Sequence, residues 1–439
     1  MDGEAESIGI RDLGLGISEK GIEIPVKAIV QALVLVGSMF AAQVAAAPKY
    51  DLLLKGGHVI DPRNNVDALR DVAISGGKIA AIAPAIDPAD ATKTIDARGL
   101  FVTPGVIDIH THVYAGTGEK GSYAGDNSVY PDVVAPRSGV TTVVDAGGSG
   151  WRSFEDFKQR IIDRSVTRVL AMLNIVGHGM RGGKFEQDLS DMAAQPTADM
   201  ARRYPGLIVG IKTAHYSGPE WIPVERAVEA GTLAALPVMV DFGANKPERP
   251  LSELVTSKLR PGDIYTHMYS GLRGEQDPSG KVNPALWQAR KRGVLFDVGH
   301  GGSSFAWRIA VPAVKEGFLP DVISTDLHVA SMSGGMKDMP NVMSKFLALG
   351  MPFDEIVRRT TWNAARAVRQ EALGHLSIEA NADVAVWRIE KGSVGLVDGP
   401  GTVLKGSQRI VPELTLRNGK VVYDLNGLAA TPVNGKGKG

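Results

Sequence analysis

The chain has no cysteine among its 439 residues. Disulfide bonds are therefore excluded, and so is a metal site built on thiolates. Any bound metal ion must be held by histidine, aspartate, glutamate or a modified side chain. The 48 basic side chains balance the 48 acidic ones, which leaves no formal net charge. Since this balance favours neither nucleic acid nor acidic surfaces, we expect a small-molecule partner and no nucleic acid.

The chain also lacks a long hydrophobic run. Its most apolar segment, residues 32–42, is shorter than the roughly 20 apolar residues that span a bilayer. The alanine-rich stretch that follows places Val44 and Ala46 at the minus-three and minus-one positions of a signal-peptidase site. Residues 1–47 are therefore predicted to be a disordered extension and a signal peptide. We expect export to the periplasm without stable membrane insertion; a tether formed by the uncleaved segment is the alternative.

Short strand-like runs near both ends of the chain predict a small β domain. In residues 48–103 these runs are separated by Gly-Gly pairs and proline. Residues 375–430 contain similar short strand-like runs, and Asn418-Gly419 is a strong hairpin signal. The similarity predicts one β-sandwich that both flanks build around an inserted central domain. Residues 431–439 are predicted to be a disordered tail.

The central segment, residues 104–374, alternates apolar runs with amphipathic stretches such as residues 154–162 and 224–236. Eight such units predict an α/β fold, a parallel (β/α)8 or TIM barrel. In that architecture the chemistry lies at the C-terminal ends of the strands. Candidate functional residues are therefore expected where each apolar run ends.

The first run ends in His110 and His112, which are separated by one residue. Alternate side chains of a strand share a face, so both imidazoles can hold one cation. Two unrelated histidines at a polar strand edge are the alternative. Against that alternative, Asp108 and the preceding Thr103-Pro-Gly are unusual in an ordinary strand. The pattern therefore indicates half of a metal site.

Later runs also deliver a polar or ionisable side chain to the same rim of the barrel. These residues are Lys212, Asp241, His267, His300 and Asp326. Each alone has an ordinary explanation, such as a hydrogen-bonded loop histidine or an aspartate that caps a helix. Their recurrence on one strand after another argues against chance placement and predicts a cluster.

Lys212 needs a separate explanation, because an ammonium group beside cations would be repelled. A lysine that is desolvated there loses its proton and can add carbon dioxide. The resulting carbamate is an anionic oxygen ligand able to bridge two metal ions. A lysine that caps the barrel rim through a salt bridge is the alternative, and the sequence leaves it open.

The segments DIHTHV, IKTAHY, THMY, DVGHGG and STDLH, in this order, resemble the amidohydrolase superfamily, specifically its deacetylase-like members near dihydroorotase. The resemblance extends to the flanks, through GGHVIDP and GHLSIEANADVAV. It implies an enzyme with two divalent metal ions, with zinc expected. One ion would be bound by His110, His112 and Asp326. The other would be bound by a residue of the fifth strand and His267, with carboxylated Lys212 as the bridge.

One departure from the family concerns the fifth strand, where histidine is usual and this chain has Asp241. A carboxylate can ligate zinc, so we expect Asp241 to be a ligand; a supporting role behind the ligands is the alternative. In the implied mechanism a metal-bridging hydroxide is the nucleophile and Asp326 is the general acid and base. His300 is expected to orient substrate or stabilise the oxyanion, with simple bonding to neighbouring backbone as the alternative.

The sequence says less about the substrate. Dihydroorotase-type enzymes follow the paired histidines with an aromatic residue and an arginine that clamps a carboxylate, and Val113-Tyr114-Ala115-Gly116 lacks that arginine. We therefore expect hydrolysis of an ester or amide bond in a small acylated compound. Arg181 or His215 is the expected carboxylate contact. The residues expected to line the pocket are Tyr114, His178, Arg181, His215, Tyr216, Tyr269 and His328.

Three functions stay open. The leading one is a metal-dependent, deacetylase-like hydrolase. The second is a cyclic amidase such as a hydantoinase or dihydroorotase. The third is a non-catalytic binding barrel that has lost its second metal through the change at Asp241. Because barrels of this kind commonly self-associate, a homo-oligomer is also to be considered.

Overall fold

The computed structural model describes residues 47–243 and 245–433. The predicted signal segment, apart from its last residue, lies outside the described residues, and so does most of the predicted C-terminal tail. The chain divides into two units, residues 1–47 and 48–439, and the architecture below is that of the second. Across the described ranges, we find no helix with the length and apolar character needed to cross a membrane.

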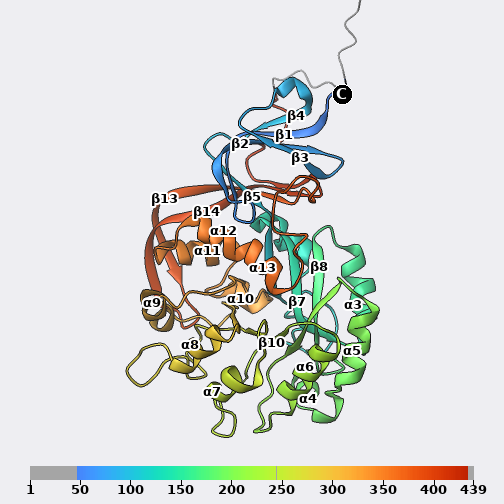
Figure 1. Ribbon diagram of the computed structural model, residues 1–439, viewed down its shortest axis with the longest axis vertical. Helices are drawn as coiled ribbons and strands as arrows, with labels where there is room; N and C mark the ends of the chain where they lie inside the picture. Colours follow the sequence, from blue (N-terminus) through green and yellow to red (C-terminus); the bar gives the residue numbers. More distant parts are fainter. Residues whose placement is uncertain (1–46, 244, 434–439) are drawn as a thin grey trace, which may run out of the picture. The chain divides into compact units, whose positions relative to one another are not determined.

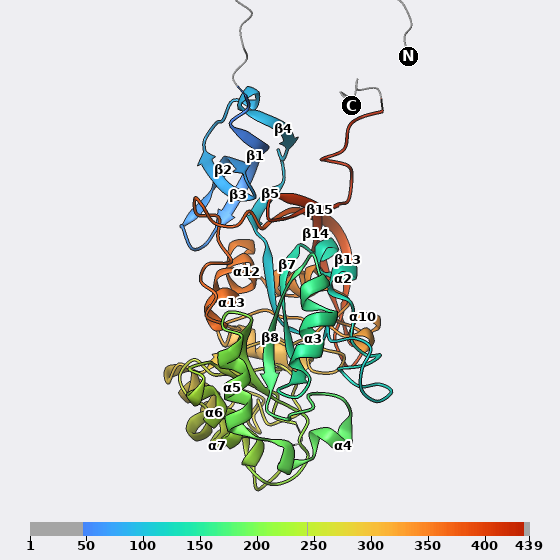
Figure 2. The ribbon, with the colours of Figure 1, turned by 90° about the vertical axis from the view of Figure 1, so that its right-hand side faces the viewer.

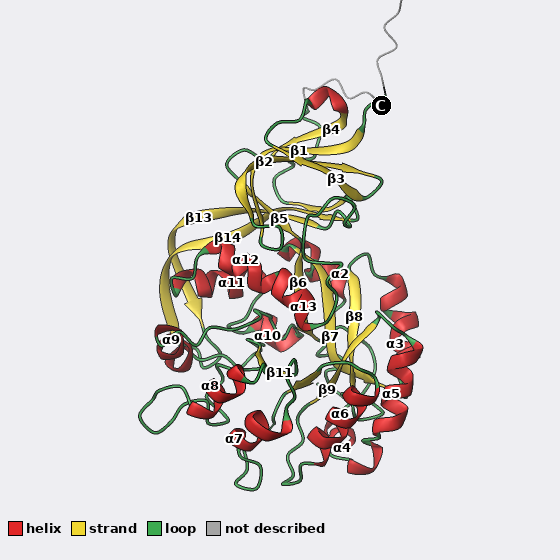
Figure 3. Ribbon diagram, viewed as in Figure 1, coloured by secondary structure: helices red, strands yellow, loops and turns green. Residues whose placement is uncertain are grey.

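A parallel sheet forms the central part of the chain (Figure 3). Its strands follow the order β12-β11-β10-β9-β8-β7-β6, and every neighbouring pair is parallel. The strands are rich in valine and isoleucine, as is usual where both faces of a parallel sheet are covered. Their bounds are β6 (Val106–Thr111), β7 (Val140–Gly150), β8 (Arg168–Asn174), β9 (Ile208–Thr213), β10 (Val238–Val240), β11 (Ile264–Tyr265) and β12 (Leu295–Phe296).

Residues 322–327 occupy the place of an eighth strand. On one side, the Val298 N–H donates to the Val322 carbonyl at 3.1 Å. On the other side, the Leu327 carbonyl accepts from the N–H of His112 at 2.8 Å, just past β6. The segment therefore bridges the two edges of the parallel sheet and closes it as in a (β/α)8 barrel. The predicted fold class is confirmed.

Helices connect the strands and cover the outside of the sheet (Figures 1 and 2). In α12, Phe353, Ile356 and Val357 are buried at helical spacing, whereas Asp354 and Arg358 are more exposed. The longer helices are α3 (Phe154–Arg160), α5 (Ala194–Arg203), α6 (Ile222–Leu233), α8 (Pro284–Lys291), α9 (Trp307–Lys315), α11 (Met339–Ala348), α12 (Phe353–Thr360) and α13 (Trp362–Ala367). The shorter ones are α2 (Pro131–Val134), α4 (Gly183–Glu186), α7 (Leu251–Glu253) and α10 (Val329–Ser333).

A second, eight-stranded sheet combines both flanks of the chain, so blue and red strands meet in Figure 1. The flanks join where β5 pairs antiparallel with β13, which places Thr103 opposite Ala385. The predicted hairpin joins β14 to β15, and its Asn418 and Gly419 both have positive φ, 49° and 73°. The strands are β1 (Tyr50–Asp61), β2 (Val66–Ser75), β3 (Lys78–Ala83), β4 (Ala91–Asp96), β5 (Phe101–Pro104), β13 (Val384–Val397), β14 (Val403–Arg417) and β15 (Lys420–Asp424).

Candidate metal centre and active site

A cavity of about 380 Å³ lies among the C-terminal ends of the barrel strands. Every residue predicted to bind metal contributes to its wall. The lining consists of His110, His112, Tyr123, Met180, Lys212, His215, Asp241, His267, Leu272, Arg273, Gly302, Ser303, Ser304, Asp326, His328 and Ala330. The barrel thus gathers in one cavity the side chains that are widely spaced in the sequence.

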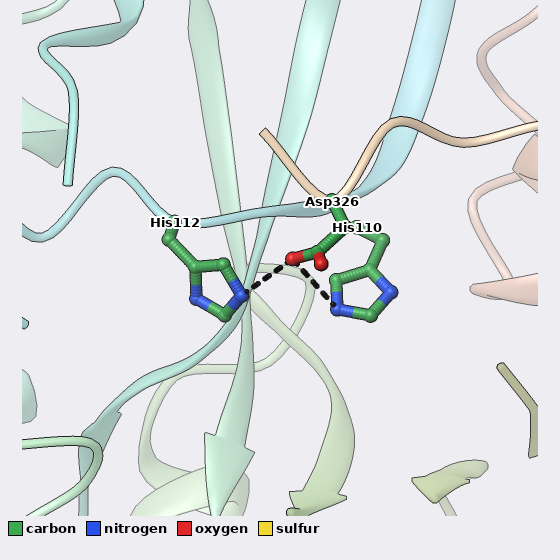
Figure 4. A group of neighbouring side chains, drawn as sticks. All are labelled: His110, His112 and Asp326. Carbon is green, nitrogen blue, oxygen red and sulfur yellow. Dashed lines mark ion pairs between the residues drawn. The ribbon is translucent and has the colours of Figure 1, made fainter. Parts of the chain in front are cut away.

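His110, His112 and Asp326 form one group whose ligand atoms all lie within 4.8 Å of one another. The Asp326 Oδ1 atom is 3.0 Å from His112 Nε2 and 3.5 Å from His110 Nε2. Figure 4 shows both imidazoles turned toward this carboxylate. The two histidines come from the end of β6, and Asp326 comes from the segment that closes the barrel beside it.

The ionisation of this group suits a divalent cation. Burial lowers the pKa of His112 to about 3 and, together with Lys212, lowers that of His110 well below its usual value. Both rings are therefore neutral and keep a lone pair for a metal ion. Burial alone would raise the pKa of Asp326, but His328, His110 and His112 hold it well below its usual range. Two neutral imidazoles and one carboxylate form a donor set that fits zinc or a similar ion.

Lys212 is fully buried next to this group. Its Nζ atom lies 3.1 Å from His110 Nε2 and 3.5 Å from Met239 Sδ. Among the described residues, no carboxylate forms a salt bridge with Lys212. The structure therefore does not support the alternative in which Lys212 caps the barrel rim through a salt bridge. Burial lowers the pKa of the amine, which favours its uncharged form.

Asp241 and His267 lie together beside Lys212, at the ends of β10 and β11. The Asp241 Oδ2 atom is 3.4 Å from Nε2 of His267 and also 3.4 Å from Nε2 of His215. The other oxygen, Oδ1, accepts a hydrogen bond of 2.7 Å from Arg273 Nη2. One oxygen of Asp241 is therefore paired with a guanidinium, and the other faces the place predicted for the second metal.

His215 is a cation in this arrangement. Its Nδ1 atom lies 2.6 Å from Glu186 Oε2. Burial by itself would lower its pKa, but hydrogen bonds to Asp241 and Glu186 raise the pKa to about 10. The carboxylate of Asp241 is thus placed between two positively charged groups, His215 and Arg273.

Three residues of the cavity have left-handed backbone conformations that are unusual for residues other than glycine. They are His215, His267 and Asp326, with φ of 60°, 64° and 52°. Such conformations cost free energy and persist only where the surroundings enforce them, as at functional sites. The barrel therefore uses strained turns to aim these side chains into the cavity.

No protein-family model matches this chain. A deacetylase of Agrobacterium fabrum is 33% identical over 347 residues, which cover 76% of this chain and 82% of that protein. A deacetylase of Enterococcus faecalis is 30% identical over 384 residues, which cover 85% of this chain and 99% of the relative. The chain belongs to the amidohydrolase superfamily.

Solved structures of other amidohydrolases share the fold. An adenine deaminase has a TM-score of 0.78 at 30% identity, and the match covers 86% of this chain and 100% of that one. A dihydroorotase has a TM-score of 0.75 at 28% identity, and the match covers 85% and 99% of the two chains. The chain is therefore a metal-dependent hydrolase of this superfamily, as its sequence motifs predict, and a divalent metal is implied.

His300 does not occupy the place that its predicted catalytic role requires. Its Nδ1 atom is 2.9 Å from the Gly301 carbonyl, and its Nε2 atom is 2.6 Å from Lys345 Nζ. The ring also stacks on Phe305 at 4.6 Å and does not line the cavity. The expectation is corrected: in this amidohydrolase His300 is fully buried in the wall, and its bond to neighbouring backbone agrees with the alternative given above.

Two of the predicted substrate contacts, His215 and His328, line the cavity. The three predicted tyrosines do not, because each hydroxyl is hydrogen-bonded to a residue outside the cavity lining. Tyr114 donates to Asp156, Tyr216 to Glu220 and Tyr269 to the Phe318 carbonyl. The expectation that these tyrosines contact substrate is therefore corrected.

His178 and Arg181 also lie outside the cavity lining. Both pack against Phe185, with a ring separation of 5.0 Å for His178 and a guanidinium separation of 6.0 Å for Arg181. Arg273 and Tyr123, which the sequence analysis missed, are in the lining instead. Both come from irregular loops after the strands, where no periodic pattern indicates which side chain turns inward.

Lys345, the partner of His300, gives a stability prediction. It is fully buried, and burial lowers its pKa to about 7. Between roughly pH 7 and pH 10 the unfolded chain binds the proton that the native Lys345 lacks, so this group makes stability rise with pH, by up to about 1.4 kcal/mol per unit. We expect Lys345→Met to remove this slope in urea unfolding at pH 7.5 and 9.5. The exposed Lys391→Met should keep it, and an unchanged slope in Lys345→Met would refute the assignment.

Proposed function

We propose that this amidohydrolase hydrolyses an ester or amide bond in a small acylated compound, as a deacetylase does. The observation that carries the proposal is the convergence of His110, His112 and Asp326 within 4.8 Å in a cavity that Lys212 and His267 also line. The deacetylases that match most of this chain support the reaction class.

The same proposal names the residues that would hold the metal ions. His110, His112 and Asp326 would hold one ion, and His267 with Asp241 would hold the second, with a carbamate on Lys212 between them. We take zinc as the metal because the donors are imidazole nitrogens and carboxylate oxygens. A divalent ion there would lower the pKa of a water molecule and polarise a carbonyl oxygen.

Asp326 is the proposed general acid and base. Its carboxylate is ionised, since its pKa is held well below the usual range, and it lies in the cavity. The residue next to Asp326 Oδ2 is a glycine, Gly301. A Cβ at this position would collide with that oxygen. The carboxylate would accept a proton from the attacking water and return it to the leaving group.

Tyr123 is the proposed donor to the carbonyl oxygen of the substrate. Its ring lies 4.6 Å from that of His112 and 5.0 Å from that of His328, in the cavity wall. Across residues 47–243 and 245–433, its hydroxyl has no hydrogen-bond partner. Burial raises the pKa of this hydroxyl, so it keeps its proton and is free to donate it to a hydrogen bond.

We expect Tyr123→Phe to lower kcat by about 10²- to 10³-fold, the usual cost of losing one oxyanion donor. KM should change little, because the hydrogen bond strengthens as charge develops. Steady-state kinetics measures both quantities. Tyr114→Phe is the matched control, since its hydroxyl donates to Asp156 outside the cavity lining, and it should keep the wild-type kcat. Equal effects of the two variants would contradict the role of Tyr123.

Arg273 is the proposed contact for a substrate carboxylate. Its Nε donates to the Gly243 carbonyl, Nη1 to Ser270 Oγ and Nη2 to Asp241. A guanidinium has five N–H groups, so two of them have no hydrogen-bond partner within the described residues. Arg273 itself lines the cavity. Together with His215, which is also a cation, it favours acylated acids over neutral acyl compounds.

A substrate panel tests the proposed function. The protein is purified with zinc and bicarbonate and assayed with N-acetyl amino acids, acetylated hydroxy acids, hydantoins, dihydroorotate and adenine. Hydrolysis of the acetylated acids, with weaker turnover of their amides, is the expected result. Turnover of the cyclic compounds alone would favour a cyclic amidase, and turnover of adenine alone a deaminase. Less than one equivalent of bound metal and no turnover would favour a binding protein.

We propose further that the protein is exported to the periplasm, with a signal-peptidase site at Ala46 and the mature chain beginning near Ala47. The sequence features that support this are the apolar segment at residues 32–42 and the small residues Val44 and Ala46. Cell fractionation followed by N-terminal sequencing tests it. An intact N-terminus in the membrane fraction would favour the uncleaved tether.

A further inference from the structure

We infer that Asp297, which lies outside the cavity lining, is a positioning residue that fixes two candidate metal-binding histidines, His110 and His267, in the orientation needed to bind cations. This inference rests on the proposed metal-dependent function. Asp297 follows β12 directly and is fully buried. It reaches the two imidazoles through two separate hydrogen-bond paths, one through a threonine and one through a serine.

The first path leads to His110. Thr266 Oγ1 donates its only hydrogen to Asp297 Oδ2 at 2.7 Å. Thr266 Oγ1 also lies 2.9 Å from His110 Nδ1. Because its only hydrogen is already used, Oγ1 must accept a hydrogen bond from that nitrogen. His110 then carries its proton on Nδ1, which leaves the lone pair of Nε2 directed at Lys212 and Asp326. The aspartate thus sets the tautomer of the ring through the threonine.

The second path leads to His267. Ser324 Oγ donates to Asp297 Oδ2 at 2.8 Å and accepts from the Gly299 N–H at 3.0 Å. The carbonyl of Gly299 in turn accepts from His267 Nδ1 at 2.6 Å. A carbonyl only accepts, so Nδ1 of His267 carries the proton and Nε2 faces Asp241. Asp297 therefore anchors, through Ser324, the N–H of Gly299, the residue whose carbonyl orients the second ring.

Gly299 lies between the two paths. Its φ is +46°, and a Cβ at this position would fall against Thr266 Oγ1 and within 2.9 Å of Nδ1 of both His110 and His267. The backbone therefore packs directly against the far side of both rings. Neither ring can rotate toward residue 299, and both present Nε2 to the cavity.

For metal binding, the consequence is that the tautomer and the orientation of both rings are fixed before a cation binds. A histidine ligand whose second nitrogen is hydrogen-bonded keeps its tautomer and orientation, and losing such a partner typically costs 10- to 100-fold in metal affinity. Here the carboxylate of Asp297 supports a ligand of each proposed metal position. Removing it should lower the metal affinity of both positions.

The test uses Thr266→Val, which keeps the shape of the side chain and removes the hydroxyl, with Thr266→Ser as the conservative variant. Zn²⁺ affinity is measured by competition with a chromogenic chelator. We expect Thr266→Val to bind Zn²⁺ about 10- to 100-fold more weakly and Thr266→Ser to bind near the wild-type level. Asp297→Leu should lose at least as much as Thr266→Val. Thr360→Val, a buried threonine on α12 whose hydroxyl donates to the Ile356 carbonyl, is the control and should leave the affinity unchanged.

A second readout needs neither metal nor activity. In metal-free protein labelled with ¹⁵N-histidine, the imidazole nitrogens report the tautomer of each ring. We expect the His110 signal to lose its fixed Nδ1–H form in Thr266→Val and to keep it in Thr266→Ser. If Thr266→Val keeps both the tautomer and the Zn²⁺ affinity of the wild type, the inference is overturned. If the wild-type protein binds no Zn²⁺, the proposed function fails instead, and the tautomer measurement still decides the role of Asp297 and Thr266.

Discussion

Replacing Asp326 by asparagine should lower kcat/KM by about 10²- to 10⁴-fold, the range that one positioned acid and base contributes. The amide keeps the shape of the side chain and one oxygen that can face the metal. It cannot accept a proton from water or return one to the leaving group. Steady-state kinetics on the best substrate of the panel, at saturating Zn²⁺, measures the effect.

Metal analysis of the same samples separates loss of the base from loss of the metal. We expect Asp326→Asn to keep most of its metal at saturating Zn²⁺, because His110 and His112 stay in place. Asp321→Asn is the matched control. Asp321 lies five residues earlier, accepts the Phe296 N–H at 2.8 Å and does not line the cavity, so its kcat/KM should stay near wild type. A near-normal rate in Asp326→Asn would exclude Asp326 as the base.

The sequence was sufficient to predict the residues that strands carry to the cavity. His110 and His112 are separated by one residue at the end of an apolar run, and the period of two places both on one face. The same rule brings Lys212, Asp241 and Asp326 to the C-terminal ends of their strands, because strand direction is uniform in a parallel barrel. These positions depend only on local periodicity and on one fold-level rule.

Loop residues could not be predicted in this way. Tyr114, Tyr216 and Tyr269 follow strands just as the metal-binding candidates do, yet their hydroxyls bond acceptors outside the cavity lining. Tyr123 and Arg273 turn into the cavity from irregular loops. Tyr216 bonds Glu220 four residues later, but the acceptors of Tyr114 and Tyr269 lie 42 and 49 residues away. No periodic pattern encodes such distant partners.

The pairing of Asp241 with Arg273 also depends on tertiary structure. The sequence shows that a carboxylate replaces the usual histidine of the fifth strand, and a negative charge in that place suggested a metal ligand. The fold adds a guanidinium 2.7 Å from one of its oxygens. Because a guanidinium and a cation compete for the same carboxylate, the second metal position should be more weakly occupied than the first.

Lys212→Met gives the second large effect that we expect. Methionine matches the buried volume of lysine and can neither add carbon dioxide nor supply oxygen ligands. Without the proposed bridge the second metal should be lost, and kcat/KM should fall by at least about 10²-fold. In addition, metal-free wild-type protein should regain activity with Zn²⁺ plus bicarbonate and much less with Zn²⁺ in buffer freed of carbon dioxide.

Lys345→Met is the matched control, because Lys345 is equally buried in the same barrel but lies outside the cavity lining. Its reactivation should depend on bicarbonate as in the wild type, whereas Lys212→Met should show no bicarbonate dependence at all. With ¹³C-labelled bicarbonate, a carbamate resonance should appear in wild type and Lys345→Met and be absent in Lys212→Met. Wild-type protein that is fully active with Zn²⁺ alone and shows no such resonance would exclude the carbamate. Lys212 would then act as an uncharged amine 3.1 Å from His110, and the two metal ions would lack their bridging ligand.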